Sequence, residues 1–291
     1  MSADTPDAGP IAPGVALVEN REGPNDLIVS GGYAYWLQPS GVYRVLESGG
    51  EPEAVQVPSG VLQAYAVTDD TLYWATTEEG VSRIRGELLA GGPTLIDATN
   101  PHTIDVLSAG PHGVFWGAAG PQDGNLWRFS DAGLVQHAQS GAVSIVTDAT
   151  HVFWSDGQFV WRSLPDGQEA ERLSGGQIGT ASLSLNDTHV FWVTEAGDIY
   201  RVKKTGGSDQ TVSTGALIGA RSTTLKGDTV YVAYRGTTAG GGPGIGRVVV
   251  GSGTLESLLE LSQRPPSFVL SGDAIIWSDF QAGAIRTIPV P

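Results

Sequence analysis

The chain is a series of short apolar stretches separated by turn residues. Runs of about five residues rich in Val, Ile, Phe, Tyr and Trp alternate with segments of Gly, Asp, Asn and Ser. Such runs predict β-strands, and no segment of ten or more residues has the apolar spacing that an amphipathic helix needs. The pattern therefore predicts an all-β protein built from many short antiparallel strands.

One apolar-aromatic pattern recurs with a period of about forty residues. Its seven copies, most of which end in Trp, are Ala34-Tyr35-Trp36, Leu72-Tyr73-Trp74, Val114-Phe115-Trp116, Val152-Phe153-Trp154, Val190-Phe191-Trp192, Val230-Tyr231-Val232 and Ile275-Ile276-Trp277. A second triplet follows each copy after a turn and ends in Arg, at Arg44, Arg83, Arg128, Arg162, Arg201, Arg247 and Arg286. A repeat of this length with room for four strands is typical of a β-propeller blade. We therefore predict a seven-bladed β-propeller of four-stranded antiparallel blades.

The two ends of the chain fit one closed ring. The seventh repeat contains only three strand-like segments, at residues 267–270, 274–278 and 284–288. A further strand-like segment at residues 14–18 precedes the first repeat and has no place in it. We expect this N-terminal strand to complete the last blade and close the ring. The chain then divides into a flexible spacer at residues 1–13 and a single propeller domain at residues 14–291.

Two repeats are similar to a known propeller family. Phe153-Trp154-Ser155-Asp156 and Ile276-Trp277-Ser278-Asp279 resemble the Tyr-Trp-Thr-Asp (YWTD) tetrad of low-density-lipoprotein-receptor-type propellers and of bacterial propellers with the same pattern. Receptor-type members resemble six-bladed rings flanked by Cys-rich modules, whereas this chain has seven copies and no Cys, so their ligand sites are not carried over. The resemblance, together with the Pro- and Ala-rich start of the chain, implies an exported bacterial lipoprotein at the cell surface or in the periplasm. A cytoplasmic location stays open.

Composition and charge narrow the choice of partners. The chain has 16 Lys and Arg against 31 Asp and Glu, a formal net charge of −15, and an acidic chain repels phosphate backbones. It has no apolar run long enough to span a membrane, and no Cys for a disulfide, a thiol nucleophile or a metal site. We therefore expect a monomer that binds a protein, a glycan or a small molecule, and no nucleic acid.

The mouth of the central channel is the expected binding face. In a propeller the loops that enter the first strands lie at the same end of the channel as the loops that join strands two and three. The polar residues at these places that we single out as ligand contacts are Asn25, Asp26, Gln63, His102, Asp105, Arg221, Tyr234, Arg235 and Arg264. Repeats three and six have the longest loops on this face, at residues 117–125 and 233–244, and such insertions often mark a binding face. The Gly-rich loop of repeat six is equally well explained as slack, an irregular insertion that the fold tolerates and that has no role in binding.

The other His residues and the repeated Arg point to structural roles. His151 and His189, with His112 close to equivalent, come at the turn before a second strand, on the face opposite the mouth. His137 falls in an outer strand, where we expect it on the surface. The repeated Arg lies on the third strand, away from the channel axis. We expect its guanidinium to stack on aromatic rings and to bond to carbonyls of the adjacent blade.

Three classes of function remain. A non-catalytic binding or scaffolding propeller is the first, and a calcium-dependent hydrolase or lyase with Asn25, Asp26 and Asp105 as metal ligands is the second. A purely structural role is the third. The chain has no Gly-x-Ser-x-Gly motif, and it has no His after His189, where the similarly sized streptogramin lyases have catalytic His in their last blades. We therefore favour binding, with no catalytic residue and no required cofactor.

Overall fold

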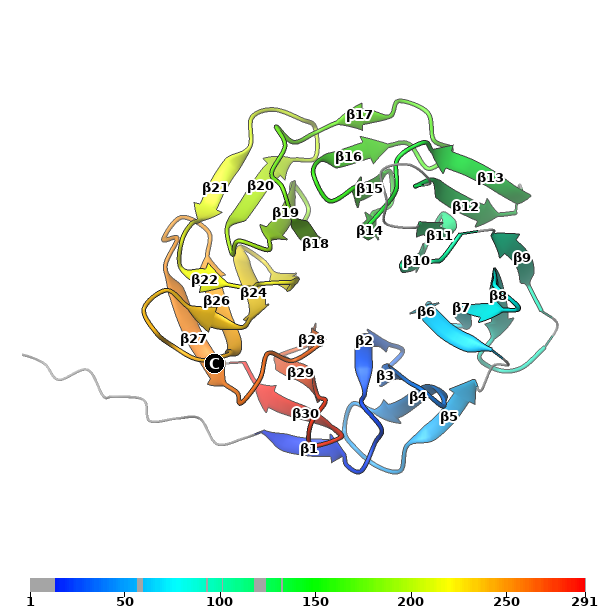
Figure 1. Ribbon diagram of the computed structural model, residues 1–291, viewed down its shortest axis with the longest axis horizontal. Helices are drawn as coiled ribbons and strands as arrows, with labels where there is room; N and C mark the ends of the chain where they lie inside the picture. The colour runs from blue at the N-terminus through cyan, green and yellow to red at the C-terminus, as the bar shows by residue number, and fades with distance from the viewer. Residues whose placement is uncertain are drawn as a thin grey trace, which may run out of the picture.

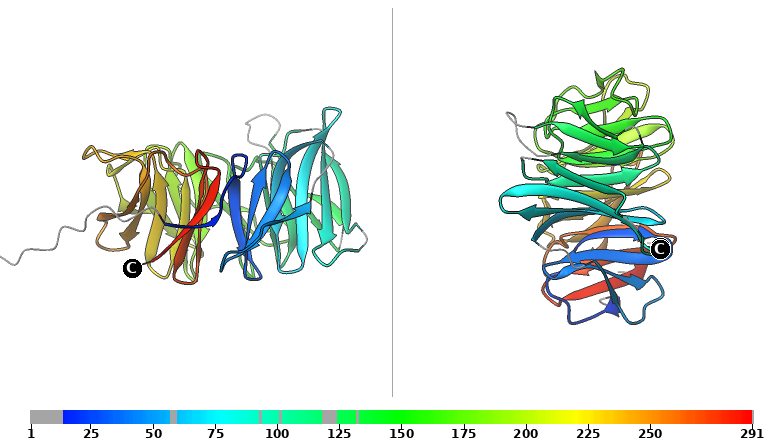
Figure 2. Two further views of the ribbon diagram at one scale, coloured as in Figure 1. Left: turned by 90° about the horizontal axis from the view of Figure 1, so that it is seen from below. Right: turned by 90° about the vertical axis from the view of Figure 1, so that its right-hand side faces the viewer.

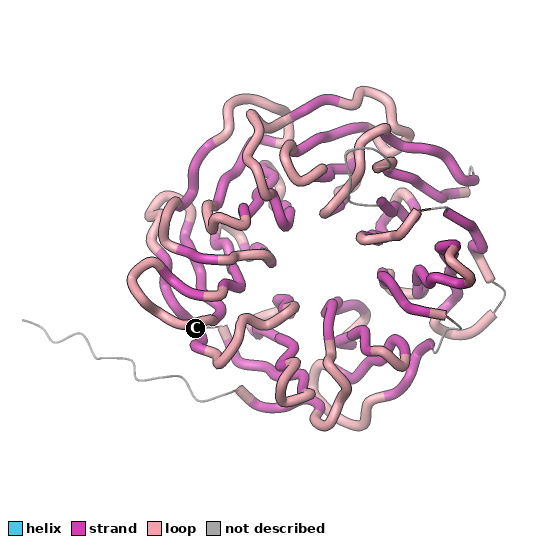
Figure 3. The backbone as a smooth tube through the Cα atoms, viewed as in Figure 1, coloured by secondary structure: helices cyan, strands magenta, loops and turns pink. Residues whose placement is uncertain are grey.

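A computed structural model shows seven four-stranded antiparallel sheets arranged as a ring around a central axis (Figure 1). The structure describes residues 14–56, 60–92, 94–100, 102–117, 124–131 and 133–290. These residues form strands and loops and no helix, so they contain no helix long and apolar enough to cross a membrane (Figure 3). The predicted seven-bladed propeller is confirmed. The predicted spacer at residues 1–13 lies outside the described residues.

The first four blades follow one another along the chain, each running from an inner strand at the axis to an outer strand at the rim (Figure 1). Seen from the side, the strands run roughly along the axis of the ring (Figure 2). Blade one contains β2 (Asn25–Ser30), β3 (Tyr33–Gln38), β4 (Gly41–Leu46) and β5 (Glu53–Gln56). Blade two contains β6 (Val61–Val67), β7 (Thr71–Glu78), β8 (Val81–Leu88) and β9 (Ile96–Asn100). Blade three contains β10 (Val106–Gly110), β11 (Gly113–Gly117), β12 (Leu126–Ser130) and β13 (Gly133–Ala138). Blade four contains β14 (Ser144–Thr147), β15 (Val152–Ser155), β16 (Val160–Ser163) and β17 (Glu171–Arg172).

The last three blades complete the ring, and blade six has an addition. Blade five contains β18 (Thr180–Leu185), β19 (His189–Thr194), β20 (Ile199–Lys203) and β21 (Gln210–Ser213). Blade six contains β23 (Ser222–Lys226), β24 (Thr229–Tyr234), β26 (Gly244–Val249) and β27 (Leu255–Glu260). Blade seven contains β28 (Phe268–Ser271), β29 (Ala274–Asp279), β30 (Ala284–Pro289) and β1 (Val15–Val18). The addition is a separate two-stranded sheet of β22 (Leu217–Ile218) and β25 (Gly236–Thr237), which the sequence pattern does not predict.

The N-terminal strand closes the ring as predicted. β1 pairs antiparallel with β30 as the outermost strand of the last sheet, with Val15 opposite Thr287 and Ala16 opposite Arg286. Arg286 Nη1 also donates to the carbonyl of Gly14 at 3.4 Å, across 272 positions of sequence. The two ends of the chain therefore hold blade seven together.

The repeated aromatic-Trp pair joins neighbouring blades. Successive residues of a strand point to opposite faces of the sheet, so Trp192 packs against blade four while Phe191 packs towards blade six. The six Trp of the repeat are each at most 1 % exposed. Buried apolar clusters occupy all seven interfaces between adjacent blades. The Trp series of the repeat therefore forms core between the blades.

Blade six departs from the pattern, and Tyr234 compensates. Val232 stands where every other blade has Trp. It lies opposite Gly246, where four other blades have an aromatic residue opposite their Trp. Tyr234 packs over this glycine: a Cβ added to Gly246 would lie 3.2 Å from Tyr234 Cε1. The Tyr234 side chain is 1 % exposed, and its hydroxyl lies 3.0 Å from Ser257 Oγ. Tyr234 therefore belongs to the core of blade six and not to the mouth surface where the sequence placed it.

The repeated Arg lies on the third strand, as expected. Arg44 lies over the ring of Tyr33, 4.4 Å from the ring centroid, and Arg162 donates to the carbonyl of Lys204 in the next blade. The structure adds a partner that the repeat does not predict, a polar residue directly opposite on the outer strand. The pairs, each nine positions apart, are Arg44–Glu53, Arg162–Glu171, Arg201–Gln210 and Arg247–Glu256. These pairs tie the outer strands to the blades.

Candidate functional site

The inner strands are irregular where they begin, at one end of the channel. In blades one, two and five, two successive residues of the inner strand oppose one residue of the second strand, which is a β-bulge. In blades three, four and six, the amide of the residue just before the inner strand donates to a carbonyl near the end of the second strand. The residues at these irregularities are Asp26, Gln63, Asp105, Val143, Ala181 and Arg221. A bulge bends the strand and redirects a side chain, and bulges occur often beside functional sites. This end of the channel is the mouth at which the sequence places the binding face.

Three of these residues line one pocket at the mouth. Asp26, Gln63 and Asp105 come from blades one, two and three, and Ser267, at the entry to β28, adds blade seven. The pocket has a volume of about 240 Å³. Gln63 Oε1 accepts from Ser82 Oγ at 3.0 Å, and Ser267 Oγ accepts from the amide of Leu27 at 2.8 Å, so both side chains are held in place. Two carboxylates, an amide and a hydroxyl therefore meet in one concave site.

Asp26 has an unusual backbone in this pocket. Its φ of +48° is left-handed, a conformation that few residues other than Gly adopt. The hydroxyl of buried Tyr65 donates to the Asp26 carbonyl and holds this conformation. The Asp26 side chain is open to the channel but surrounded by protein, and this desolvation raises the pKa of its carboxyl group. Strained backbone of this kind clusters at ligand sites.

Three arginines that the sequence singled out meet on blades six and seven. Arg264 Nη1 donates to the carbonyl of Gly219 at 2.8 Å, and Arg235 Cζ would lie 3.7 Å from a Cβ added to the same Gly219. Arg221 lies two residues further along the chain, and its Nη2 donates to Glu195 Oε1 at 3.1 Å. Burial, followed by the charges of Arg221 and Arg235, lowers the pKa of Arg264. Arg264 is thus close enough to Arg221 and Arg235 for their charges to act on it.

The extra two-stranded sheet positions these arginines. In it Leu217 pairs with Thr237 and Ile218 with Gly236, and the amide of Arg235 donates to the carbonyl of Ile218 at 2.9 Å. The long loop of repeat six therefore forms an ordered extension that pairs with the linker from blade five. It is not the irregular, tolerated insertion that was the alternative. Of the other long loop, residues 118–123 lie outside the described residues.

The remaining predicted contacts lie apart from the pocket. Asn25 begins β2 opposite Leu37, and His102 lies between β9 and β10, where its amide donates to Asn100 Oδ1 at 2.9 Å. Neither lines the pocket that contains Asp26 and Asp105. The three side chains nominated for calcium are thus not brought into one pocket. Among the residues that the structure describes, no group of three His, Asp or Glu side chains is arranged to hold a metal ion.

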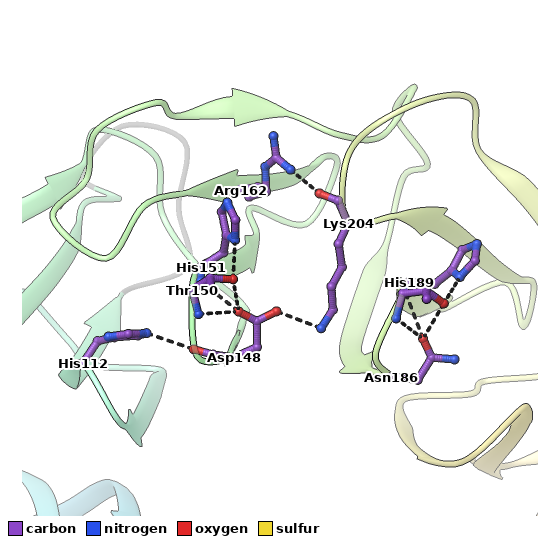
Figure 4. A network of polar contacts seen from close by, with 9 residues as sticks. His112, Asp148, Thr150, His151, Arg162, Asn186, His189 and Lys204 are labelled. Atoms are coloured by element: carbon purple, nitrogen blue, oxygen red, sulfur yellow. Dashed lines mark hydrogen bonds and ion pairs between the residues drawn. The ribbon is translucent and has the colours of Figure 1, made fainter.

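The opposite face carries turns that tie blades three, four and five together (Figure 4). His112 Nε2 lies 2.9 Å from the carbonyl of Asp148, and Lys204 Nζ lies 2.8 Å from Asp148 Oδ2. Asp148 Oδ1 accepts from the amides of Thr150 and His151, both at 2.8 Å. Burial alone would raise the pKa of Asp148, but these hydrogen bonds lower it well below its usual range. The predicted turn role of His151 is confirmed.

His137 corrects a prediction. It lies in outer strand β13, as expected, but its side chain is 6 % exposed and is not on the surface. Its ring lies edge-on to Phe115 and Trp154, and its Nε2 is 2.8 Å from Ser163 Oγ. Burial, with the charge of Arg128, lowers the pKa of His137 to about 4. His137 is therefore a neutral packing residue between blades three and four.

Comparisons with solved structures show the fold alone. The WD40 β-propeller domain of Doa1 has a TM-score of 0.70 at 14% identity, with 94% of this chain and 95% of that chain covered. The RRP9 WD40 repeats have a TM-score of 0.70 at 12% identity, with 97% and 98% covered. A chain of a nidogen/laminin complex has a TM-score of 0.54 at 17% identity, with 80% and 95% covered. No protein-family model and no curated protein matches the sequence.

Proposed function

We propose that this protein is a non-catalytic binding propeller that recognises a protein, a glycan or a small ligand at the mouth of its channel. The observation that carries the proposal is the pocket in which four blades bring together Asp26, Gln63, Asp105 and Ser267. Ligand sites are concave and contain a few convergent polar groups, as this pocket does. The strained backbone of Asp26 adds support, because such strain is maintained mainly where a site needs it.

Exposed apolar side chains on the same face support recognition of a partner. Val61, Val81, Ile178, Ile218 and Phe280 are all exposed, and each lies near the entry to an inner strand or in a loop between strands two and three. Ile218 directly precedes the Gly219 that Arg264 contacts, and Phe280 lines a small cleft with Arg264. Aromatic residues and Arg are both enriched at protein interfaces. One of the similar solved structures is itself a complex of two proteins, nidogen and laminin.

Thermal melting with a ligand panel tests the proposal. The panel contains calcium, EDTA, glycans and peptides, and a ligand that binds only the native state raises the melting temperature by mass action. We expect the shift to be largely lost in Asp105→Asn and kept in Asp187→Asn. Asp187 is an exposed residue in a turn on the opposite face, so its substitution is a matched control. Shifts that are equal in the two variants would contradict a site at the mouth.

A calcium-dependent hydrolase or lyase is the second candidate, favoured by the two carboxylates that share the pocket, Asp26 and Asp105. Its test is turnover of lactones or esters in the presence and absence of a divalent metal. Metal-dependent turnover that Asp26→Ala or Asp105→Ala abolishes would replace the binding function by an enzymatic one. We expect no such turnover.

An exported location, at the cell surface or in the periplasm, completes the proposed function. Its support is the resemblance of Phe153-Trp154-Ser155-Asp156 and Ile276-Trp277-Ser278-Asp279 to the repeats of exported bacterial propellers. Fractionation of the cells that produce the protein tests this point, and recovery from the cytoplasm alone would contradict it.

A further inference from the structure

We propose that Arg221, Arg235 and Arg264 form a docking site for an acidic peptide segment of a partner protein. This inference rests on the proposed function, because it names the ligand chemistry of one part of the same mouth. Its starting point is the meeting of Arg235 and Arg264 at Gly219, on a linker between two blades, with Arg221 near enough for its charge to act on Arg264.

The charge of this site is opposite to that of the whole molecule. The chain has 16 Lys and Arg against 31 Asp and Glu, and Arg residues on third strands pair with outer-strand carboxylates, as Arg44 and Arg247 do. Arg235 differs: within the part of the chain that the structure describes, its exposed side chain makes no ion pair or hydrogen bond. Arg264 donates to a neutral carbonyl. The site therefore has surplus positive charge and complements an acidic ligand.

The backbone around the site is held before any ligand binds. Gly219 has a φ of +63°, which an L-residue with a side chain rarely adopts, and a Cβ there would lie 3.1 Å from Arg235 Cβ. The pairing of β22 with β25 fixes the segments on which Gly219 and Arg235 lie. Holding the groups in place in advance reduces the entropy that binding costs.

Glu195 shows that a carboxylate fits this site. It accepts from Arg221 Nη2 at 3.1 Å, and the two side chains are 57% and 60% exposed. Exposed ion pairs of this kind contribute little stability, so a ligand carboxylate can replace Glu195 at small cost. An Arg guanidinium can also hold a carboxylate through two parallel hydrogen bonds.

Exposed apolar side chains beside the arginines favour a peptide over a free ion. Ile218 lies in β22 directly before Gly219, and Phe280 lines a small cleft together with Arg264. Both are large, apolar and exposed. A segment that carries acidic and apolar residues side by side could contact both kinds of group at once, as protein interfaces rich in Arg and aromatic residues do.

Peptide selection followed by titration tests the site. Random peptides of about 12 residues are displayed on phage and selected on the immobilised full-length protein, and the best one is synthesised with a fluorescent label for anisotropy. We expect the selected peptides to be enriched in Asp and Glu next to apolar residues. Arg235→Glu should weaken binding at least about tenfold, because it replaces an attraction by a repulsion. Glu195→Gln should tighten it about two- to fivefold, because it frees Arg221.

Lys203→Glu is the matched control, since it makes the same change of charge at an exposed residue that ends β20 on the opposite face. It should leave the affinity within about twofold, as expected for a screened, distant charge. Equal weakening by Arg235→Glu and Lys203→Glu, or selection of peptides without acidic residues, would overturn the proposal. Inorganic phosphate that displaces the peptide at equal concentration would also overturn it, in favour of a small-anion site. In either case an Asp105-dependent shift in the thermal panel would leave the proposed function standing.

Discussion

His137 links the protonation of one residue to the stability of the ring. Its pKa is about 4 in the folded protein, against 6.5 for an unperturbed His, because burial and then Arg128 disfavour the charged ring. The unfolded chain therefore binds more protons between these values. The stabilisation that comes from keeping His137 neutral is complete above pH 6.5 and is lost as the pH falls towards 4. A shift of this size corresponds to at most about 3 kcal/mol.

We expect His137→Gln to reduce this pH dependence. Urea unfolding at pH 7 and pH 5 measures this dependence. The unfolding free energy of the wild type should fall by about 1–2 kcal/mol from pH 7 to pH 5, and that of the variant should fall clearly less. His102→Gln, at a partly exposed His, is the control that keeps the wild-type dependence. The same loss in His137→Gln as in the wild type would show that His137 titrates normally in the folded protein.

Blade six shows which features of an element a sequence can predict. The repeat fixes where each inner strand begins relative to the second-strand Trp, so Asp26, Gln63 and Asp105 could be singled out and do line one pocket. The place of Tyr234 depends on Gly246, a partner on another strand, which the repeat does not specify. The β22–β25 sheet was not predictable for the same reason, since it pairs a linker with a distant loop through strands of two residues.

Two substitutions of Tyr234 test its role in blade six. Tyr234→Phe keeps the ring over Gly246 and loses only the hydroxyl contact with Ser257, so we expect a loss of about 1 kcal/mol in unfolding free energy. Tyr234→Ala leaves a cavity in the core and should cost about 3–5 kcal/mol. Chemical denaturation measures both values. Equal, small losses would mean that Tyr234 does not fill this part of the core.

At the scale of the whole molecule, closure of the ring depends on β1. The strand pairs with β30, and its Val18 packs in the cluster between blades seven and one. Seven repeats with a missing last strand made this closure predictable from the sequence, because a propeller has to pair the edge that the last repeat leaves open.

Truncation tests the closure. Deletion of residues 1–18 removes β1, exposes the edge of β30 and opens an apolar cluster. We expect the melting temperature to fall by about 10 °C or more, as several kcal/mol would cause in a domain of this size. Deletion of residues 1–13 keeps β1 and should melt like the full chain. Equal melting of the two truncated proteins would contradict a structural role for the strand.

Hydrogen exchange of the full chain with and without the selected acidic peptide tests the binding face most directly. Binding at the mouth should slow exchange in segments 214–221, 233–244 and 261–267, which contain the three arginines and the β22–β25 sheet. Exchange in the turns at residues 148–151 and 186–189, on the opposite face, should not change. Slower exchange in those turns, with the three arginine segments unaffected, would contradict the mouth as the binding face.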